Sequence, residues 1–238
     1  MTLKRVLSLA LMLSTALPVF SQVQLFEAEV SGIVPFGGVK WNSGITEWVA
    51  GVEYNIDGRT TLGLTYGQPL KDTLTFDKDL KSYTLNPYAI FEFIEPDNLK
   101  SFSFAIRGDF IQEDTKTKAK GTADSLKYNS FSRTQIGGGP IFALRLFSSD
   151  KLIFIPSAGY EFFYVESKRN QLASSTDGDF PKETFLWHDV VGACSIHFLI
   201  NQFNGLNFEP KVTAKFGKTR SSKDMLNVSA NLGYVKAF

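Results

Sequence analysis

The last fourteen residues of the chain, Met225 to Phe238, alternate between apolar and small polar side chains. Leucine, valine, alanine and tyrosine occupy every second position from Leu226 to Tyr234, and asparagine, serine and glycine lie between them. Because successive side chains of a strand point to opposite faces, this pattern predicts a strand with one apolar face. An ordinary strand has about five or six residues, whereas a strand that crosses a bilayer has about nine to eleven. The segment is therefore predicted to span a membrane.

A final amphipathic strand that ends on phenylalanine resembles the C-terminal strand of bacterial outer-membrane β-barrel proteins. Leu232, Tyr234 and Phe238 carry the resemblance. Lys236 departs from it, because an aromatic or aliphatic residue is usual there, although a lysine at the interface can extend its ammonium group into water. The resemblance implies that the barrel-assembly machinery recognises the Phe238 strand and that this strand closes against the first one.

The N-terminus predicts export. Lys4 and Arg5 precede an apolar run from Val6 to Val19, which is typical of a secretory signal peptide. The run is shorter than the roughly twenty residues of a spanning helix. We expect residues 1–21 to be removed near Ser21, and residues 22–238 to form one domain in the cell outer membrane. An uncleaved anchor is the alternative.

The composition excludes several classes of protein. With 25 basic and 24 acidic residues, the chain has no basic excess of the kind that marks nucleic-acid binding. Two histidines and one cysteine give no cluster with metal-ligand spacing, so we expect neither a metal site nor a cofactor.

Nine earlier segments resemble the last one. Four short turns alternate with five longer connections between the ten predicted strands. Membrane barrels have an even number of strands, short periplasmic turns and longer external loops. The sequence therefore predicts an all-β fold, a ten-stranded antiparallel up-and-down transmembrane barrel. The nine segments are Leu25–Val34, Thr46–Ile56, Thr60–Gly67, Leu80–Ile94, Ser101–Ile111, Tyr128–Phe147, Leu152–Val165, Thr184–Ile200 and Leu206–Phe216.

Three connections and one glycine run complete this pattern. Pro35–Gly44, Gln112–Lys127 and Glu166–Glu183 are predicted to be loops, and the lysines of the second one to be solvated. Gly137-Gly138-Gly139-Pro140 lacks the Lys-Ser/Thr pair of a phosphate-binding loop. Inside a strand, such a run predicts relieved curvature or a bulge.

Alternation alone does not separate a membrane barrel from a secreted soluble β-protein, whose apolar face would point inward. The polar faces here carry mostly serine, threonine, asparagine and glycine, and the apolar faces carry phenylalanine, leucine, valine and tyrosine. Small polar residues suit a narrow interior, and bulky apolar residues suit lipid. Because a lysine on the lipid face costs about 2–4 kcal/mol near the bilayer midplane, Lys211 and Lys215 assign their face to the interior.

With this assignment, acids outnumber bases in the predicted interior by eight to five. Charges of both signs in a confined space are expected to pair and to accept or donate hydrogen bonds. The facing of Leu152–Val165 is ambiguous because both faces are apolar, and we place Glu161 inside. The predicted polar network consists of Glu53, Glu92, Arg107, Asp109, Arg133, Asp189, His197, Glu209, Lys211 and Lys215, and the wider interior set adds Glu27, Glu29, Arg145 and Glu161.

One pair in this network suggests chemistry. If Phe203 is the centre of its turn, His197 lies opposite Glu209, with Ser195 on the same face. Ser195 and His197 are two positions apart, about 7 Å, which is too far for direct proton transfer. Barrel proteases resembling omptins and lipid A-modifying hydrolases carry their catalytic residues toward the outer rim. There this chain offers only His188 and Asp189, which as neighbours point to opposite faces.

These observations predict a non-enzymatic outer-membrane barrel with no catalytic residues, whose external loops meet an unidentified ligand or partner. The alternatives are a narrow passive pore for small polar solutes or cations, and a barrel hydrolase that depends on His197, Asp189 or His188. The predicted partners are outer-membrane lipid and the assembly machinery, with no nucleic acid, and the predicted state is a monomer.

Overall fold

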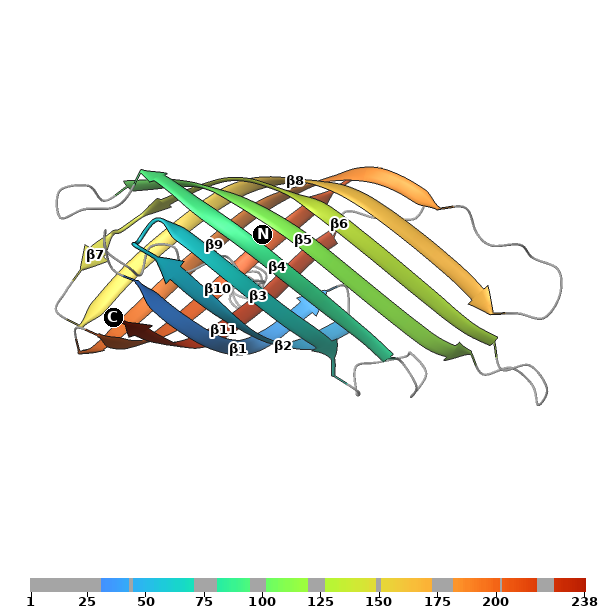
Figure 1. Cartoon of the computed structure of the whole chain (residues 1–238), viewed down its shortest axis with the longest axis horizontal. Coiled ribbons are helices and arrows are strands. Elements are labelled where there is room, and N and C mark those ends of the chain that lie inside the picture. The colour runs from blue at the N-terminus through green and yellow to red at the C-terminus, as the bar shows by residue number, and fades with distance from the viewer. Residues whose placement is uncertain are drawn as a thin grey trace, which may run out of the picture.

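A computed structural model describes residues 31–42, 45–70, 81–94, 102–119, 127–148, 151–172, 182–201, 203–217 and 225–238. Within these ranges the chain is almost entirely β-sheet (Figure 1). None of the described residues forms a helix that is long and apolar enough to cross a membrane. The strands are β1 (Gly32–Asn42), β2 (Ile45–Ile56), β3 (Thr60–Pro69), β4 (Lys81–Ile94), β5 (Phe102–Ala119), β6 (Lys127–Leu144), β7 (Phe147–Ser148), β8 (Leu152–Leu172), β9 (Glu183–Asn201), β10 (Asn204–Phe216) and β11 (Met225–Ala237).

Ten long strands close into a barrel, and the two-residue β7 pairs with the start of β8. Every pairing is antiparallel, and consecutive strands are neighbours from β1 to β6 and from β8 to β11. β6 also pairs with β8, and β1 pairs with β11, so that each long strand has a partner on both sides. The predicted ten-stranded antiparallel barrel is confirmed.

A tight turn joins β2 to β3, as predicted. Asp57 and Gly58 both have positive φ values, 52° and 70°, which suit the primed turns that connect twisted hairpin strands. The side-chain oxygen of Asn55 accepts a hydrogen bond from the Gly58 N–H at 2.8 Å. We call this end of the barrel, which also holds Phe203 and Phe238, the turn end. The opposite end, where residues 43–44, 71–80, 120–126, 173–181 and 218–224 join the strands, is the loop end.

The first strand was predicted at the wrong place. The strand lies at Gly32–Asn42 rather than Leu25–Val34, and its pairing with β2 runs through the whole segment expected to be a glycine-rich connection. Val34 was assigned to the lipid face but is fully buried inside, together with Phe36. Residues 25–30 lie outside the described residues. Only Ser43 and Gly44 then separate β1 from β2, so the predicted alternation of short and long connections is wrong at this point.

Two strands, β5 and β8, extend further than predicted toward the loop end, whereas β6 begins within one residue of its predicted start. β5 and β6 stay paired as far as Ala119 and Lys127, and β6 and β8 as far as Tyr128 and Leu172. Much of the predicted loops at Gln112–Lys127 and Glu166–Glu183 is therefore strand. These segments have no apolar face, and a polar strand outside lipid has no sequence pattern that separates it from a loop. The barrel wall is consequently longer at β5, β6 and β8 than at β1 to β3 (Figure 1).

The glycine run in β6 allows a close approach of backbones. A side chain at Gly139 would collide with the backbone of Tyr160 in β8, and one at Gly138 with that of Arg107 in β5. Gly138 also has a φ of 151°, in the region that favours glycine. The pairing register of β6 is the same before and after the run, so the alternative of a bulge is not found.

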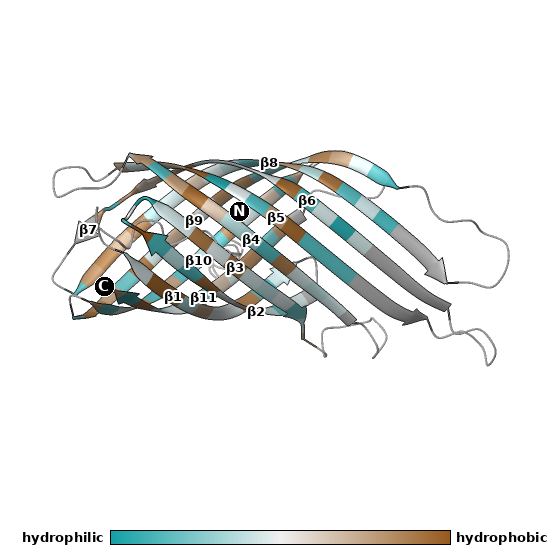
Figure 2. Cartoon of the chain, viewed as in Figure 1, coloured by the Kyte–Doolittle hydropathy of each residue, from teal (hydrophilic) through white to brown (hydrophobic). Residues whose placement is uncertain are grey.

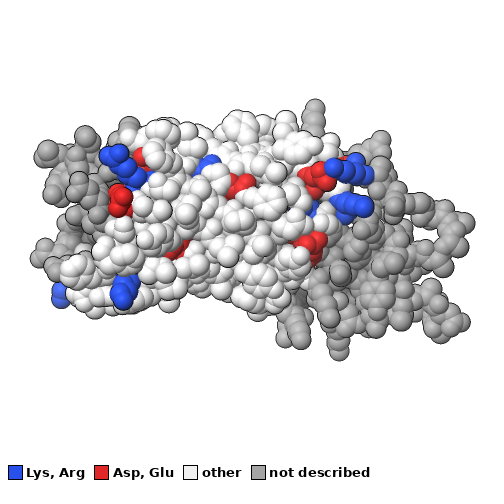
Figure 3. All heavy atoms as spheres, viewed as in Figure 1, with Lys and Arg blue, Asp and Glu red and all other residues white. Residues whose placement is uncertain are grey.

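The large apolar side chains point outward. Figure 2 shows hydrophobic and hydrophilic residues alternating along the strands, and in Figure 3 the charged side chains on this face lie mostly toward the two ends. In β8, Phe162 and Tyr164 are about half exposed, whereas Glu161, Phe163 and Val165 are buried. This settles the facing of that strand, which was ambiguous because both of its faces are apolar. Such an outer surface suits lipid, as the predicted membrane barrel requires.

The assignment of the outward-facing apolar side chains to a lipid-facing belt can be tested at Leu232, which is 59 % exposed near the middle of β11. We expect Leu232→Arg to lower the free energy of unfolding in lipid vesicles by about 2–4 kcal/mol, because the guanidinium group would face the bilayer midplane. Leu226→Arg, at the loop end of the same strand, is the depth control and should cost about 0–1 kcal/mol. Urea titrations followed by heat-modifiable gel migration measure both. Equal losses would contradict the assigned belt.

Candidate functional site

The structure places all ten residues of the predicted polar network on the inner face of the barrel. Arg133 and Lys215 are half-buried, and the other eight are buried. Glu161 is also buried inside, and Arg145 lies half-buried between β6 and β7. Glu27 and Glu29 lie outside the described residues. The sequence assigned these acids and bases to the inner face because a charged side chain facing lipid is costly. Lys211 and Lys215 show this most clearly, since both lie on the same face of β10.

Three further charged residues belong to this interior. Lys40 lies in β1 and Glu113 in β5, both within segments predicted to be connections, and Glu47 lies in β2 on the predicted polar face. Glu113 has the same parity as Arg107 and Asp109. Continuing that alternation past Ile111 would have found it.

A buried ion cluster crosses the middle of the barrel. Nε and Nη2 of Arg107 donate hydrogen bonds to the two oxygens of Asp109, at 2.7 and 2.6 Å. Nε also lies 3.8 Å from Oε1 of Glu161, and the guanidinium carbon lies 4.1 Å above the ring of Tyr88. The Tyr88 hydroxyl in turn donates a hydrogen bond to Glu53. The cluster links β2, β4, β5 and β8 through side chains inside the sheet.

Apolar residues fill the space around this cluster. They are contributed by six strands and are at most 8 % exposed: Phe36, Val49, Tyr88, Ile90, Ala105, Ile141 and Val191. Protein interiors of this kind are close-packed. The centre of the barrel is therefore closed by side chains.

The predicted pair between His197 and Glu209 is wrong. Asn207 lies opposite His197, and Glu209 instead accepts a hydrogen bond from the Ser195 hydroxyl at 2.7 Å. The turn between β9 and β10 is irregular, with a shift of register at Asn204 and Gly205. From Gly205 onward, each paired β10 residue consequently meets a β9 residue two positions away from the expected one, which a symmetric turn centred on Phe203 does not anticipate.

The loop-end residues His188 and Asp189 point to opposite faces, as predicted. His188 faces outward, where its Nδ1 lies 3.1 Å from the hydroxyl of Tyr160 and its ring meets the edge of Phe162. Asp189 points inward and pairs with Lys215 at 3.4 Å. Among the described residues, no group of three or more His, Cys, Asp or Glu side chains could hold a metal ion.

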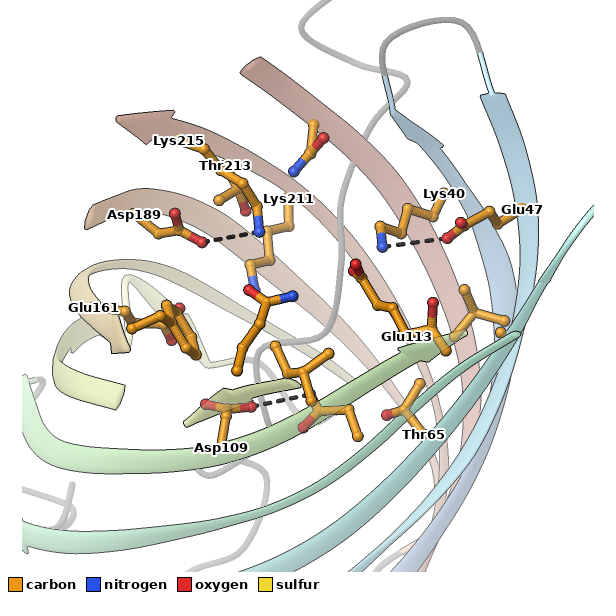
Figure 4. Close-up of a pocket in the computed structure, with 18 of the residues that line it drawn as sticks. Lys40, Glu47, Thr65, Asp109, Glu113, Glu161, Asp189, Lys211, Thr213 and Lys215 are labelled. Carbon is orange, nitrogen blue, oxygen red and sulfur yellow. Dashed lines mark hydrogen bonds and ion pairs between the residues drawn. The ribbon is translucent and has the colours of Figure 1, made fainter. Parts of the chain in front are cut away.

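A pocket of about 100 Å³ lies between the ion cluster and the loop end (Figure 4). Three ion pairs border it: Lys40–Glu47 at 3.2 Å, Arg133–Glu113 at 3.1 Å and Lys215–Asp189. The Trp187 ring lies under two of these cations, 4.6 Å from the guanidinium carbon of Arg133 and 5.0 Å from Nζ of Lys215. Such contacts add cation–π attraction to the ion pairs.

Exposure of the charged side chains falls from the loop end to the middle. The side chains of Lys40, Glu47, Glu113, Arg133 and Lys215 are 13–21 % exposed, and those of Arg107, Asp109 and Glu161 only 2–7 %. The pocket is therefore reached from the loop end and ends at the ion cluster.

Several deeply buried polar groups in this pocket have no hydrogen-bond partner. Both amide atoms of Gln135 and Asn227 are unpartnered, as are the hydroxyls of Thr65 and Thr213, and all four residues line the pocket. None of the four is more than 8 % exposed. Unpartnered buried polar groups are costly, so these side chains imply bound water or a bound solute.

The ion cluster supplies a test of the closed interior. Arg107→Met should lower the free energy of unfolding by about 3–5 kcal/mol, because Asp109 would stay buried without its cation. The double variant Arg107→Met/Asp109→Leu removes both charges and should recover at least half of that loss. Urea unfolding of the refolded protein in detergent compares the two. A double variant as unstable as the single one would show that the charge pairing is not what matters.

Comparisons with known proteins support the fold. No protein-family model matches the sequence, and no curated protein matches it significantly. Solved structures do match. The outer-membrane protease OmpT from Escherichia coli aligns with a TM-score of 0.51 and 5 % identity over 88 % of this chain and 96 % of its own. The translocator domain of the autotransporter NalP from Neisseria meningitidis aligns with a TM-score of 0.53 and 11 % identity over 91 % of both chains.

Both matches cover nearly the whole of each chain. At sequence identities this low, they show a shared fold and nothing more. They agree with the closed antiparallel sheet. The chain has the fold of bacterial outer-membrane β-barrel proteins.

Proposed function

We propose that this protein is an integral outer-membrane barrel with a closed interior, which acts without enzymatic chemistry by presenting its loop end to partners or to the surroundings. The observation that carries the proposal is that most of the inner side chains along the middle of the barrel are buried. A barrel of about eight strands is just filled by its side chains, and ten strands are only slightly wider.

Closure of the interior favours this role over a pore. A continuous aqueous path would leave the inner side chains hydrated, but Arg107 and Ile90 are at most 3 % exposed. The ion cluster and the apolar residues around it lie in any such path. A passive pore would need both to move aside.

The arrangement of connections supports an orientation with the turn end toward the periplasm. The chain ends there, and the connections at residues 71–80, 173–181 and 218–224 join strands at the opposite end. Membrane barrels carry their longer connections outside. A signal peptide at residues 1–21 and recognition of the Phe238 strand by the assembly machinery belong to the same proposal, as do a lipid-embedded monomer and an unidentified partner at the loops.

A hydrolase is not supported by the inner residues. The Ser195 hydroxyl is engaged with Glu209, His197 faces Asn207, and His188 faces outward. Catalysis by a serine with a histidine base requires the imidazole within about 3 Å of the hydroxyl proton that it takes. Among the described residues, these histidines do not provide one.

The closed interior predicts an absence of conductance. The folded chain, reconstituted in a planar bilayer in potassium chloride, should give no current steps. A variant in which Phe36, Ile90, Ile141, Arg107 and Asp109 are all replaced by alanine, and which still shows a heat-modifiable gel shift, serves as the opened control and should give steps. Steady conductance of the unaltered protein would support the pore instead.

The proposed orientation predicts which epitopes are accessible. A short tag inserted at residues 120–126 should bind antibody on intact cells, because this connection lies at the loop end. The same tag at residues 97–98, at the turn end, should bind only after the outer membrane is permeabilised. The reverse pattern would invert the orientation, and labelling of neither tag in membrane fractions would exclude the outer membrane.

A further inference from the structure

The pocket between the ion cluster and the loop end has a lining that suits a bound solute. Its lining combines ion pairs, unpartnered amides and hydroxyls, and the apolar side chains Val49, Ile111 and Phe163. This inference rests on the proposed closed interior, since an open conduit would have no end wall.

The charges around the pocket balance. Five acidic and five basic side chains line or border it, and the acids are paired with bases around the whole rim. A balanced set has no net charge that would favour an anion over a cation, and an ion that entered would lose its hydration. The acids are Glu47, Asp109, Glu113, Glu161 and Asp189, and the bases are Lys40, Arg107, Arg133, Lys211 and Lys215.

The unpartnered polar groups of the pocket would be satisfied by a ligand that donates hydrogen bonds. Acceptor oxygens without a hydrogen bond are present on Asn86, Gln135, Asp189 and Asn227, whereas the unpartnered N–H donors come only from Gln135 and Asn227 within this pocket. The hydroxyls of Thr65 and Thr213 can take either role. A solute with several O–H or N–H groups satisfies this set.

The volume limits the size of the solute. An apolar cavity of about 150 Å³ admits benzene, which has six heavy atoms. A pocket of about 100 Å³ therefore admits roughly four to six heavy atoms with close packing. The apolar side chains of its lining would contact a short carbon skeleton.

We infer that the loop-end pocket binds a small uncharged solute rich in hydroxyl or amide groups, such as a short polyol or a simple amide. The solute enters from the loop end, exchanges hydrogen bonds with Gln135 and Asn227, and stops at the Arg107–Asp109 pair. Binding involves no covalent step and no metal.

Saturation-transfer NMR on the folded full chain in detergent tests this inference, with glycerol and acetamide as probes. Both should give saturable signals. Gln135→Leu and Asn227→Leu should each weaken binding about tenfold, because each replaces a hydrogen-bonding amide by an apolar group of similar size. Asn207→Leu is the matched control, since Asn207 is equally buried with both amide atoms unpartnered but lies outside the pocket. It should leave binding unchanged.

Three outcomes would overturn the inference. If neither probe gives a saturable signal, the pocket holds only water. Equal weakening by Asn207→Leu would place the effect outside the pocket. If methylammonium or acetate binds more tightly than the neutral probes, the class of solute is wrong. Heat-modifiable migration confirms that each variant is folded, and because conductance is measured separately, loss of probe binding alone would leave the proposed closed barrel intact.

Discussion

The structure depends on the need to pair every backbone N–H and C=O group inside a bilayer, where no water replaces a missing partner. Closure of the sheet meets that need, because β1 pairs with β11 and β6 with β8. The seam is reinforced at its end, where the N–H of Phe238 donates to the carbonyl of Ser31 at 3.0 Å. Once the sheet is closed, each strand has only two faces to offer, one to lipid and one to a narrow interior. Apolar side chains such as phenylalanine then face the lipid, and charged ones such as glutamate face the interior.

The sequence predicts this sorting well wherever a strand lies in lipid. Lys211 and Glu161 were correctly placed inside, since the cost of a charge in hydrocarbon leaves no other choice. Prediction failed where that constraint is absent. β1 was misplaced because glycine and proline obscure its alternation, and β5 and β8 were predicted too short because their outer parts are polar on both faces.

The candidate site was only partly predictable, for a different reason. The identities of the inner charges follow from parity within one strand, but their pairing depends on register between strands. A shift at Asn204 and Gly205 brings Ser195, not His197, to Glu209. The pocket combines residues from β1 to β6 and from β8 to β11, including Lys40 and Glu113. Such a convergence appears only after closure, because no local pattern encodes which strands face one another across the interior.

The unequal strand lengths have a consequence for access. β8 has 21 residues, whereas β3 has 10. About ten residues suffice to cross the hydrocarbon, so the remainder of β8 extends the wall by roughly 25 Å at the usual tilt. The loop end of the barrel is therefore oblique. The wall is tall at β5, β6 and β8 and low at the β1–β2 hairpin. The rim is lowest at this hairpin, beside the Lys40–Glu47 ion pair that borders the loop-end pocket.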